Sequence, residues 1–219
     1  MRPNPITMLQ NLLIIRDNAH GADVPGKRSP DGTHLEWKWS RERWNQIEIM
    51  LKALGFTVVD TNPTDKEIGL WNRVAIANKF VEMYPNLTPL LLSLHNDASG
   101  ITSEWREPRG VSVWTCRKEN SSDSYAAEMI AEFDKLTKGR TRMRRYHWQH
   151  GKEDFEKDFT VLLGNYHAIL IECCFQDNKK DVALLKDPIF NKMVEDTIVT
   201  GIERIAKIID PKYKSSYEK

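Results

Sequence analysis

The run Leu90-Leu91-Leu92-Ser93-Leu94 stops at a histidine, His95. Two further apolar runs end in a similar way, since 12–15 leads to His20 and 168–171 stops at Glu172. Short apolar runs of this kind are typical of buried strands in a parallel sheet. Ligands of open α/β sheets bind beyond the carboxyl ends of the strands, so we expect His20, His95 and Glu172 to face one another.

Strand and helix patterns alternate outward from these runs. The sequence predicts strands at 12–16, 56–59, 90–94, 111–115, 159–163 and 168–171, and helices at 37–54, 64–80, 122–136 and 188–209. A capping box at 64–67 is expected to open the second helix. The order predicts an α/β fold: a single domain, residues 1–210, with a mostly parallel twisted sheet of about six strands and helices on both faces. Residues 211–219 are expected to form a short flexible tail.

The composition narrows the class of protein. A hydrophobic content of 40% and a charged content of 29% are those of a soluble globular protein. The net charge of +1 gives no support for nucleic-acid binding. No run reaches the roughly 20 apolar residues that span a bilayer, and no signal peptide is evident, which favours cytoplasmic synthesis. An odd count of 3 cysteines argues against a disulfide framework.

A catalytic zinc ion takes three protein ligands and leaves one position for water. His20 and His95 supply two, and Glu36, which opens the first predicted helix, is the expected third. His34 is an alternative third ligand. It lies two residues before Glu36, so on a strand-like approach its side chain would point to the same side. Glu172 is then the expected general base, which takes a proton from water and returns it to a leaving nitrogen.

Each of these residues also has an ordinary structural interpretation. A histidine after a strand is more often hydrogen-bonded than metal-bound, and Glu36 alone fits an exposed carboxylate favoured by the helix dipole. Glu172 is harder to explain in this way. It follows four apolar residues, and ionised carboxylates are seldom buried without a partner.

Local motifs support the catalytic interpretation. The chain resembles the zinc-dependent N-acetylmuramoyl-L-alanine amidases, a family of bacterial cell-wall amidases and phage endolysins. That family has Asp-x-Gly-His-Gly, a Glu that opens a helix, Leu-x-x-Arg-x-x-x-Ala-Asn, Ser-x-His-x-Asn/Asp-Ala and Glu-x-Gly-Phe-x-x-Asn. The matching segments here are, in the same order, 17–21, Glu36, 70–78, 93–98 and 172–178.

The resemblance implies that His20, Glu36 and His95 hold one zinc ion and that Glu172 is the catalytic carboxylate. It implies cleavage of the amide between the lactyl group of N-acetylmuramic acid and L-alanine in peptidoglycan. Three positions depart from the family pattern: Ala19 and Cys174 each replace a glycine, and Ala22 stands where a second glycine is common. No departure removes an expected ligand.

The charged stretch 140–150 has two interpretations. Such runs are usually solvated loops. As a groove wall, Arg144 and Arg145 would bind carboxylates of the substrate and Trp148 would pack on it, with Asn96 as a further substrate contact. A regulatory flap remains a third alternative.

Three functions stay open at this point. The expected lack of an export signal and of a wall-binding module favours a phage-type endolysin that reaches the cell wall through a holin lesion. The catalytic domain of an exported enzyme would look similar. The alternatives are a zinc peptidase or carboxypeptidase that acts on cell-wall peptides, and a wall-binding module without catalysis.

Overall fold

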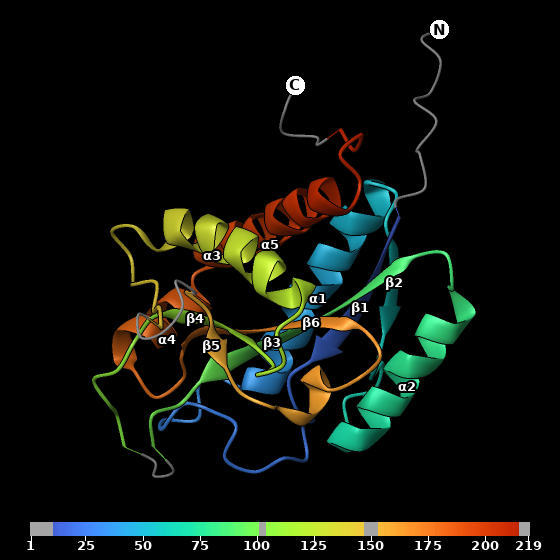
Figure 1. Ribbon diagram of the computed structural model, residues 1–219. Helices are drawn as coiled ribbons and strands as arrows, with labels where there is room; N and C mark the ends of the chain where they lie inside the picture. Colours follow the sequence, from blue (N-terminus) through green and yellow to red (C-terminus); the bar gives the residue numbers. More distant parts are fainter. Residues whose placement is uncertain (1–10, 101–103, 147–152, 215–219) are drawn as a thin grey trace, which may run out of the picture.

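The computed structural model describes residues 11–100, 104–146 and 153–214. Within these ranges the chain forms one six-stranded sheet, in the order β2-β1-β3-β6-β4-β5 (Figure 1). The strands are β1 (Leu12–Asn18), β2 (Thr57–Asp60), β3 (Thr88–Asp97), β4 (Val111–Thr115), β5 (Phe155–Glu156) and β6 (His167–Phe175).

The sheet is mostly parallel, as predicted. β1 pairs in parallel with β2 and β3, and β3 pairs in parallel with β6. β4 runs antiparallel to β6, and the short β5 is parallel to β4. The carboxyl ends of β1, β3 and β6 therefore meet at one edge, where the sequence places the candidate site.

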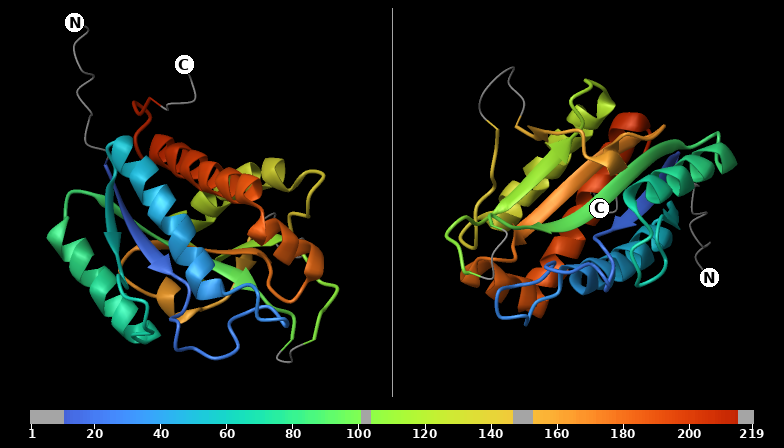
Figure 2. Two further views of the ribbon diagram at one scale, coloured as in Figure 1. Left: turned by 180° about the vertical axis from the view of Figure 1, so that it is seen from behind. Right: turned by 90° about the horizontal axis from the view of Figure 1, so that it is seen from below.

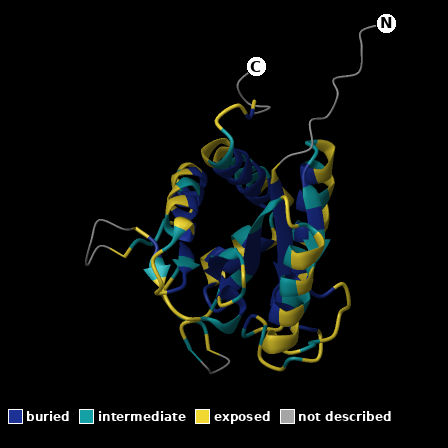
Figure 3. Cartoon of the chain, turned by 45° about the vertical axis from the view of Figure 1, so that its right-hand side comes forward, coloured by how far each residue is buried: buried dark blue, intermediate teal, exposed yellow. Residues whose placement is uncertain are grey.

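Helices lie on both faces of the sheet, but they cover the faces unequally (Figure 2). The helices are α1 (Glu36–Ala53), α2 (Leu70–Met83), α3 (Ser121–Thr137), α4 (Lys179–Lys186) and α5 (Pro188–Ile209), with a short 3-10 helix, η1 (Thr160–Leu162). α1, α3 and α5 bury one face around Trp44, Phe133 and Phe190. On the other face, α2 and η1 form a smaller core. The helices turn a buried side to the sheet and an exposed side outward (Figure 3).

Two predicted elements are wrong. Residues 64–67 do not open a helix, because α2 begins at Leu70 after Gly69, whose φ is +85°. The Glu67 carboxylate binds Arg73 instead of capping the chain, at 2.9 Å. The predicted strand 159–163 is largely η1, whose apolar side chains pack against the α2 face of the sheet. A short apolar run does not distinguish the two conformations.

Two elements were not predicted. β5 is only two residues long, too short to leave a period in the sequence. α4 does leave a local signal, because the Asn178 side chain accepts hydrogen bonds from the backbone of Lys180 and Asp181 at 3.0 and 3.1 Å. Asparagine is among the preferred N-cap residues.

The first residues of the predicted tail pack against the domain. Tyr213 is buried, its hydroxyl donates a hydrogen bond to Glu203 at 2.8 Å, and its ring contacts Phe56. Residues 215–219 lie outside the described residues. Among the described helices, none has both the length and the apolar character needed to cross a membrane.

Candidate metal centre and catalytic site

Strand alternation places the predicted site residues on one face of the sheet. His95 in β3 and Glu172 in β6 are register partners, and Asp17 in β1 is the partner of Ser93. Residues two apart on a strand share a face, so Asp17, His95 and Glu172 all point to the α2 side of the sheet. The site thus lies at the carboxyl ends of the strands and on the face that the helices cover less.

His20 follows β1 in a strained conformation, with φ +47°. Few residues other than glycine adopt this region. Two arginines stabilise it: the His20 carbonyl accepts hydrogen bonds from Arg41 at 2.9 Å and from Arg73 at 3.2 Å. The next residue must be glycine, because a Cβ at Gly21 would lie 2.0 Å from the backbone nitrogen of Glu67.

A buried ion pair between Arg73 and Asp17 stabilises this turn. Arg73 contacts the Asp17 carboxylate at 2.9 Å and also donates to the backbone carbonyl of Asn18. Asp17 accepts further hydrogen bonds from Ser93 at 2.6 Å and Thr61 at 2.8 Å. Arg73 lies in the matched segment 70–78, and its contacts are structural.

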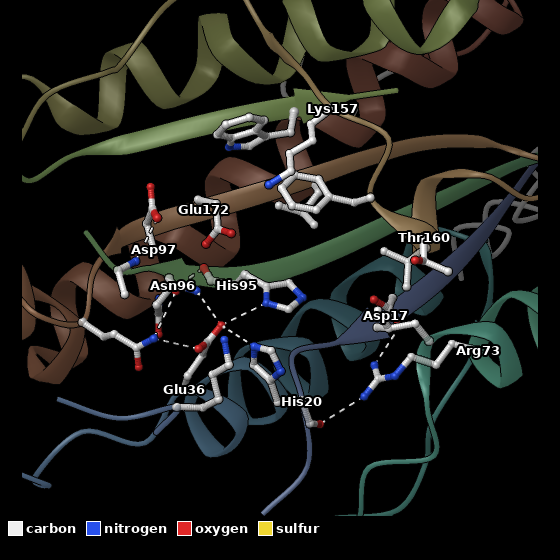
Figure 4. Close-up of a pocket in the computed structure, with 18 of the residues that line it drawn as sticks. Asp17, His20, Glu36, Arg73, His95, Asn96, Asp97, Lys157, Thr160 and Glu172 are labelled. Atoms are coloured by element: carbon white, nitrogen blue, oxygen red, sulfur yellow. Dashed lines mark hydrogen bonds and ion pairs between the residues drawn. The ribbon is translucent and has the colours of Figure 1, made fainter. Parts of the chain in front are cut away.

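Three side chains converge into a cluster that could hold a metal ion (Figure 4). Glu36 Oε1 lies 2.9 Å from His95 Nδ1 and 3.4 Å from His20 Nε2. One ligand atom from each of the three residues lies within 4.8 Å of the other two. Two imidazoles and one carboxylate are a donor set that catalytic zinc uses, with a fourth position left for water. The residues present therefore fit a zinc ion.

The protonation state of Glu36 also suits a ligand. Burial raises the pKa of its carboxyl, but hydrogen bonds and charge from His20 and His95 outweigh burial and hold the pKa below its usual range. Burial lowers the pKa of His20. An ionised carboxylate and neutral imidazoles are the forms that bind metal.

Two groups outside the cluster orient Glu36. Gln176 donates a side-chain hydrogen bond to Oε2 at 2.9 Å, and the Asn96 backbone nitrogen donates to Oε1 at 3.2 Å. Gln176 lies 140 residues from Glu36 along the chain, and no local pattern in the sequence indicates the contact. Such outer partners fix the direction of a ligand.

His34, the predicted competitor, is turned away from the cluster. It is buried, and its Nε2 lies 2.8 Å from the Asn96 side-chain oxygen. It therefore helps to hold Asn96, whose amide nitrogen donates to the Cys173 carbonyl at 2.6 Å. Of the two candidates for the third ligand, the structure brings Glu36 to the two histidines.

Glu172 lies beside the cluster and faces the same cavity (Figure 4). Its Oε2 is buried and has no hydrogen-bond partner among the described residues. Burial, and then the charges of Asp97 and Glu36, raise the pKa of Glu172 well above its ordinary value. A buried carboxyl without a partner is unfavourable in a purely structural role, and a raised pKa is a property of groups that exchange protons with substrates.

The described residues predicted to contact substrate lie in different surroundings. Arg144 pairs with Asp97 at 2.7 Å, and Arg145 lies between Asp134 and Glu153 at 3.1 and 3.0 Å. Asn96 lines the cavity. Trp148 lies outside the described residues. Their contacts with substrate stay predictions.

Cys174, which replaces the expected glycine, adopts φ +66°. Glycine is favoured in this left-handed region because a Cβ is strained there. Ala19, another departure, has no positive φ. All three cysteines are buried and free, in agreement with the expected absence of a disulfide framework.

The cavity over these residues has a volume of about 570 Å³, a size typical of small-ligand sites. Leu70, Trp114 and Phe159 give it apolar walls. The cavity combines a candidate metal cluster with a buried carboxyl of raised pKa, as a metal-dependent hydrolase requires.

Comparisons with known proteins agree with this chemistry. A model of the N-acetylmuramoyl-L-alanine amidase family matches residues 14–204. No curated protein matches the chain. The catalytic domain of the amidase CwlV from Bacillus (Paenibacillus) polymyxa var. colistinus is 23% identical, with a TM-score of 0.73 over 90% of this chain and 99% of that one.

Two further solved structures have the same fold. An N-acetylmuramoyl-L-alanine amidase from Clostridium difficile 630 is 21% identical, with a TM-score of 0.73 over 91% of this chain and 97% of that one. The catalytic domain of CD27L, an endolysin targeting Clostridium difficile, is 17% identical, with a TM-score of 0.60 over 87% and 96% of the two chains.

Proposed function

The chain belongs to the N-acetylmuramoyl-L-alanine amidase family, whose model spans most of it, and we propose that it is a zinc-dependent peptidoglycan hydrolase. It cleaves the amide between the lactyl group of N-acetylmuramic acid and the L-alanine of the stem peptide. The convergence of His20, Glu36 and His95 next to Glu172, with its unpartnered carboxyl oxygen, carries this proposal.

In this proposal His20, Glu36 and His95 hold one zinc ion. Zinc, when bound, polarises the substrate carbonyl and lowers the pKa of a water molecule. Gln176 and the Asn96 backbone keep the Glu36 carboxylate turned toward the histidines. Arg41 and Arg73 keep the His20 backbone in its strained turn, so the imidazole is oriented before any ligand arrives.

Glu172 performs the proton transfers. Its carboxylate accepts a proton from the attacking water and delivers that proton to the leaving L-alanine nitrogen. A carboxyl with a raised pKa is suited to both steps, because it holds the proton after the first and releases it in the second. Trp114 and Phe159 shield the cavity from bulk water on one side.

Substrate contacts extend from the cavity along the loops. Asn96 lines the cavity directly, so we propose that it contacts the substrate near the scissile amide. The Arg144–Asp97 pair lies next to Asn96, and the stretch with Arg145 and Trp148 follows it in the sequence. In this proposal that stretch contacts more distant parts of the muropeptide. In this proposal the catalytic domain comprises residues 1–210.

The proposed biological role is that of a phage-type lysis enzyme. The likeness to the CD27L endolysin catalytic domain supports this role, although the bacterial amidases are the more similar solved structures. Production of the protein inside a host bacterium, with and without a holin, tests it. Rapid lysis that depends on both the holin and Glu172 is the expected result. A protein that never lyses its host, yet cleaves purified walls, would instead indicate a bacterial maintenance enzyme.

The activity is tested by treating purified peptidoglycan with chelator-treated and zinc-restored protein. The expected result is the release of new L-alanine amino termini that disappears with chelator and returns with zinc. New termini of any other residue would indicate a peptidase instead. A zinc-loaded, folded protein that releases no termini from several wall types would contradict the proposal.

A further inference from the structure

Charged side chains line the cavity, and most of them already have a partner of opposite charge. The pairs are Asp17–Arg73 at 2.9 Å, Asp97–Arg144 at 2.7 Å and Asp158–Arg117 at 3.7 Å. Glu36 contacts the two histidines. Two cations remain: within the described part of the chain, Lys27 and Lys157 line the cavity without a carboxylate at ion-pair distance.

Lys157 extends into the cavity from the segment after β5 (Figure 4). Its backbone nitrogen donates to the Thr115 carbonyl at 2.9 Å, which anchors the residue to the end of β4. Its ammonium lies 4.6 Å from the centre of the Phe159 ring. The Phe159 ring contacts Trp114 in turn, at 5.5 Å. Aromatic contact orients the ammonium without neutralising its charge.

Lys27 reaches the cavity from the side of the metal cluster. Its backbone carbonyl accepts a hydrogen bond from the Glu36 nitrogen at 3.1 Å, so the loop that carries Lys27 is tied to the start of α1. Its ammonium lies close enough to His20 and Glu172 for its charge to act on both. Lys27 and Lys157 therefore approach Glu172 and the cluster from two separate loops.

The charges in the cavity would not balance with a metal ion bound. A divalent metal ion at the cluster would be offset by Glu36 and Glu172, and the two lysines would then leave the cavity with an excess of positive charge. Two cations next to a metal site repel it and each other unless an anion lies between them. The cavity is thus complementary to a substrate that brings a negative charge close to the scissile bond.

We propose that Lys27 and Lys157 bind a free carboxylate of the stem peptide. In this proposal, which rests on the proposed amidase function, the carboxylate belongs to the second stem residue, D-glutamate. The protein therefore prefers stems in which the α-carboxylate of D-glutamate is free over stems in which it is amidated.

The size of the cavity favours the second residue over more distant ones. Both lysines share one cavity of about 570 Å³ with the metal cluster. An extended residue adds only about 3.3–3.6 Å of length, so the residue after L-alanine still lies close to the scissile amide. Arg144 is less suited to the role, because Asp97 already neutralises it at 2.7 Å.

Two soluble compounds that differ only in this group provide the test. They are N-acetylmuramoyl-L-alanyl-D-glutamate and its D-isoglutamine counterpart, in which the carboxylate is an amide. The zinc-loaded protein is expected to cleave the acid with a kcat/KM about tenfold higher than the amide, as one well-placed charged contact allows. Lys27→Met and Lys157→Met should each reduce this ratio, and the double variant should bring it close to one. Lys79→Met, on the exposed side of α2, is the matched control and should leave the ratio unchanged.

Binding to the zinc-free protein gives a second measurement that does not depend on catalysis. In a chemical-shift titration the acid should bind more tightly than the amide, and the double lysine variant should lose this difference. Equal kcat/KM and equal affinity for the two compounds in the unaltered protein would overturn the proposal, as would a full preference in the double variant. If neither compound nor peptidoglycan is cleaved, the amidase function fails, and the titration still decides the role of the lysines.

Discussion

His95 and Glu172 are register partners on the neighbouring parallel strands β3 and β6. One carries a candidate metal ligand and the other the candidate proton carrier, and both side chains point to the same face of the sheet. Their separation is therefore set by the spacing between two hydrogen-bonded strands rather than by flexible loops. Functional groups on such rigid elements are positioned before substrate binds.

The first prediction concerns the proton carrier. Glu172→Gln should lower kcat on muropeptide by about 10²- to 10⁴-fold, because general acid–base catalysis contributes on that scale. Zinc binding should be retained, since Glu172 is not in the ligand cluster. Glu82→Gln, at an exposed position of α2, is the control and should keep full activity. Undiminished lysis by the Glu172→Gln protein would contradict the assignment.

The second prediction distinguishes the proposed zinc ligands from His34, the alternative ligand. The protein should bind one zinc ion, measured by elemental analysis and calorimetry, and His20→Ala, Glu36→Ala and His95→Ala should each lose it. His34→Ala should keep it, because His34 contacts Asn96 instead of the cluster. Zinc at about 100 times its Kd should stabilise the fold by about 2.7 kcal/mol. Loss of zinc binding in His34→Ala alone would reverse the choice between His34 and Glu36.

The third prediction concerns the pH dependence of the zinc-free protein. The pKa of Glu172 is raised in the folded state, so this group favours folding most below its ordinary pKa of 4.5, and the contribution is lost as the pH rises through the folded value. Glu172→Gln cannot ionise. At pH 7 its free energy of unfolding should therefore be larger than that of the unaltered zinc-free protein. Denaturant titrations at several pH values measure the difference, which should vanish toward pH 4. A constant difference at every pH would show that Glu172 does not titrate as proposed.

How much of this structure the sequence predicts depends on how local each signal is. The final helix, 188–209, has the predicted bounds, because Pro188 opens it and its apolar face is regular. The first helix is displaced by one residue, and the central strand β3 extends beyond 90–94 at both ends. Buried runs thus predict where an element lies better than where it ends.

The elements and site residues that were predicted wrongly or missed depend on contacts between residues distant in the sequence. Residues 64–67 fit a capping box, but Glu67 binds Arg73 instead. The motifs indicated His20, Glu36 and His95, whereas the choice between Glu36 and His34 required the fold. Gln176 and Arg41, which contact Glu36 and the His20 backbone, were not predicted at all, because their partners lie far away in the sequence.

The fourth prediction tests the support beneath His20. Arg73→Met leaves the buried Asp17 carboxylate without its ion-pair partner and should destabilise the fold by about 3–5 kcal/mol. Arg117→Met removes an exposed pair with Asp158 and should change stability by less than about 1 kcal/mol. Thermal unfolding of the two variants makes the comparison. Similar melting temperatures would show that the Arg73–Asp17 pair is dispensable.

The fifth prediction concerns the strained cysteine. Cys174→Gly and Cys174→Ala both remove the thiol, but only glycine relieves the positive φ, so the glycine variant should be more stable by about 1 kcal/mol. At Cys173, which has no positive φ, the order should be reversed, since glycine in a strand is less stable than alanine by roughly 0.5–1 kcal/mol. Equal stabilities of the two variants at position 174 would argue against strain there.

The unequal covering of the sheet affects how a polymer can approach the cavity. α1, α3 and α5 occupy one face, while the helices that the described residues place on the opposite face are α2 and η1 (Figure 2). A long glycan strand can lie across such a face from the side, without being threaded by its end. An enzyme of this shape can cut stems anywhere along an intact, cross-linked wall, so its rate should depend little on how many free chain ends the wall offers.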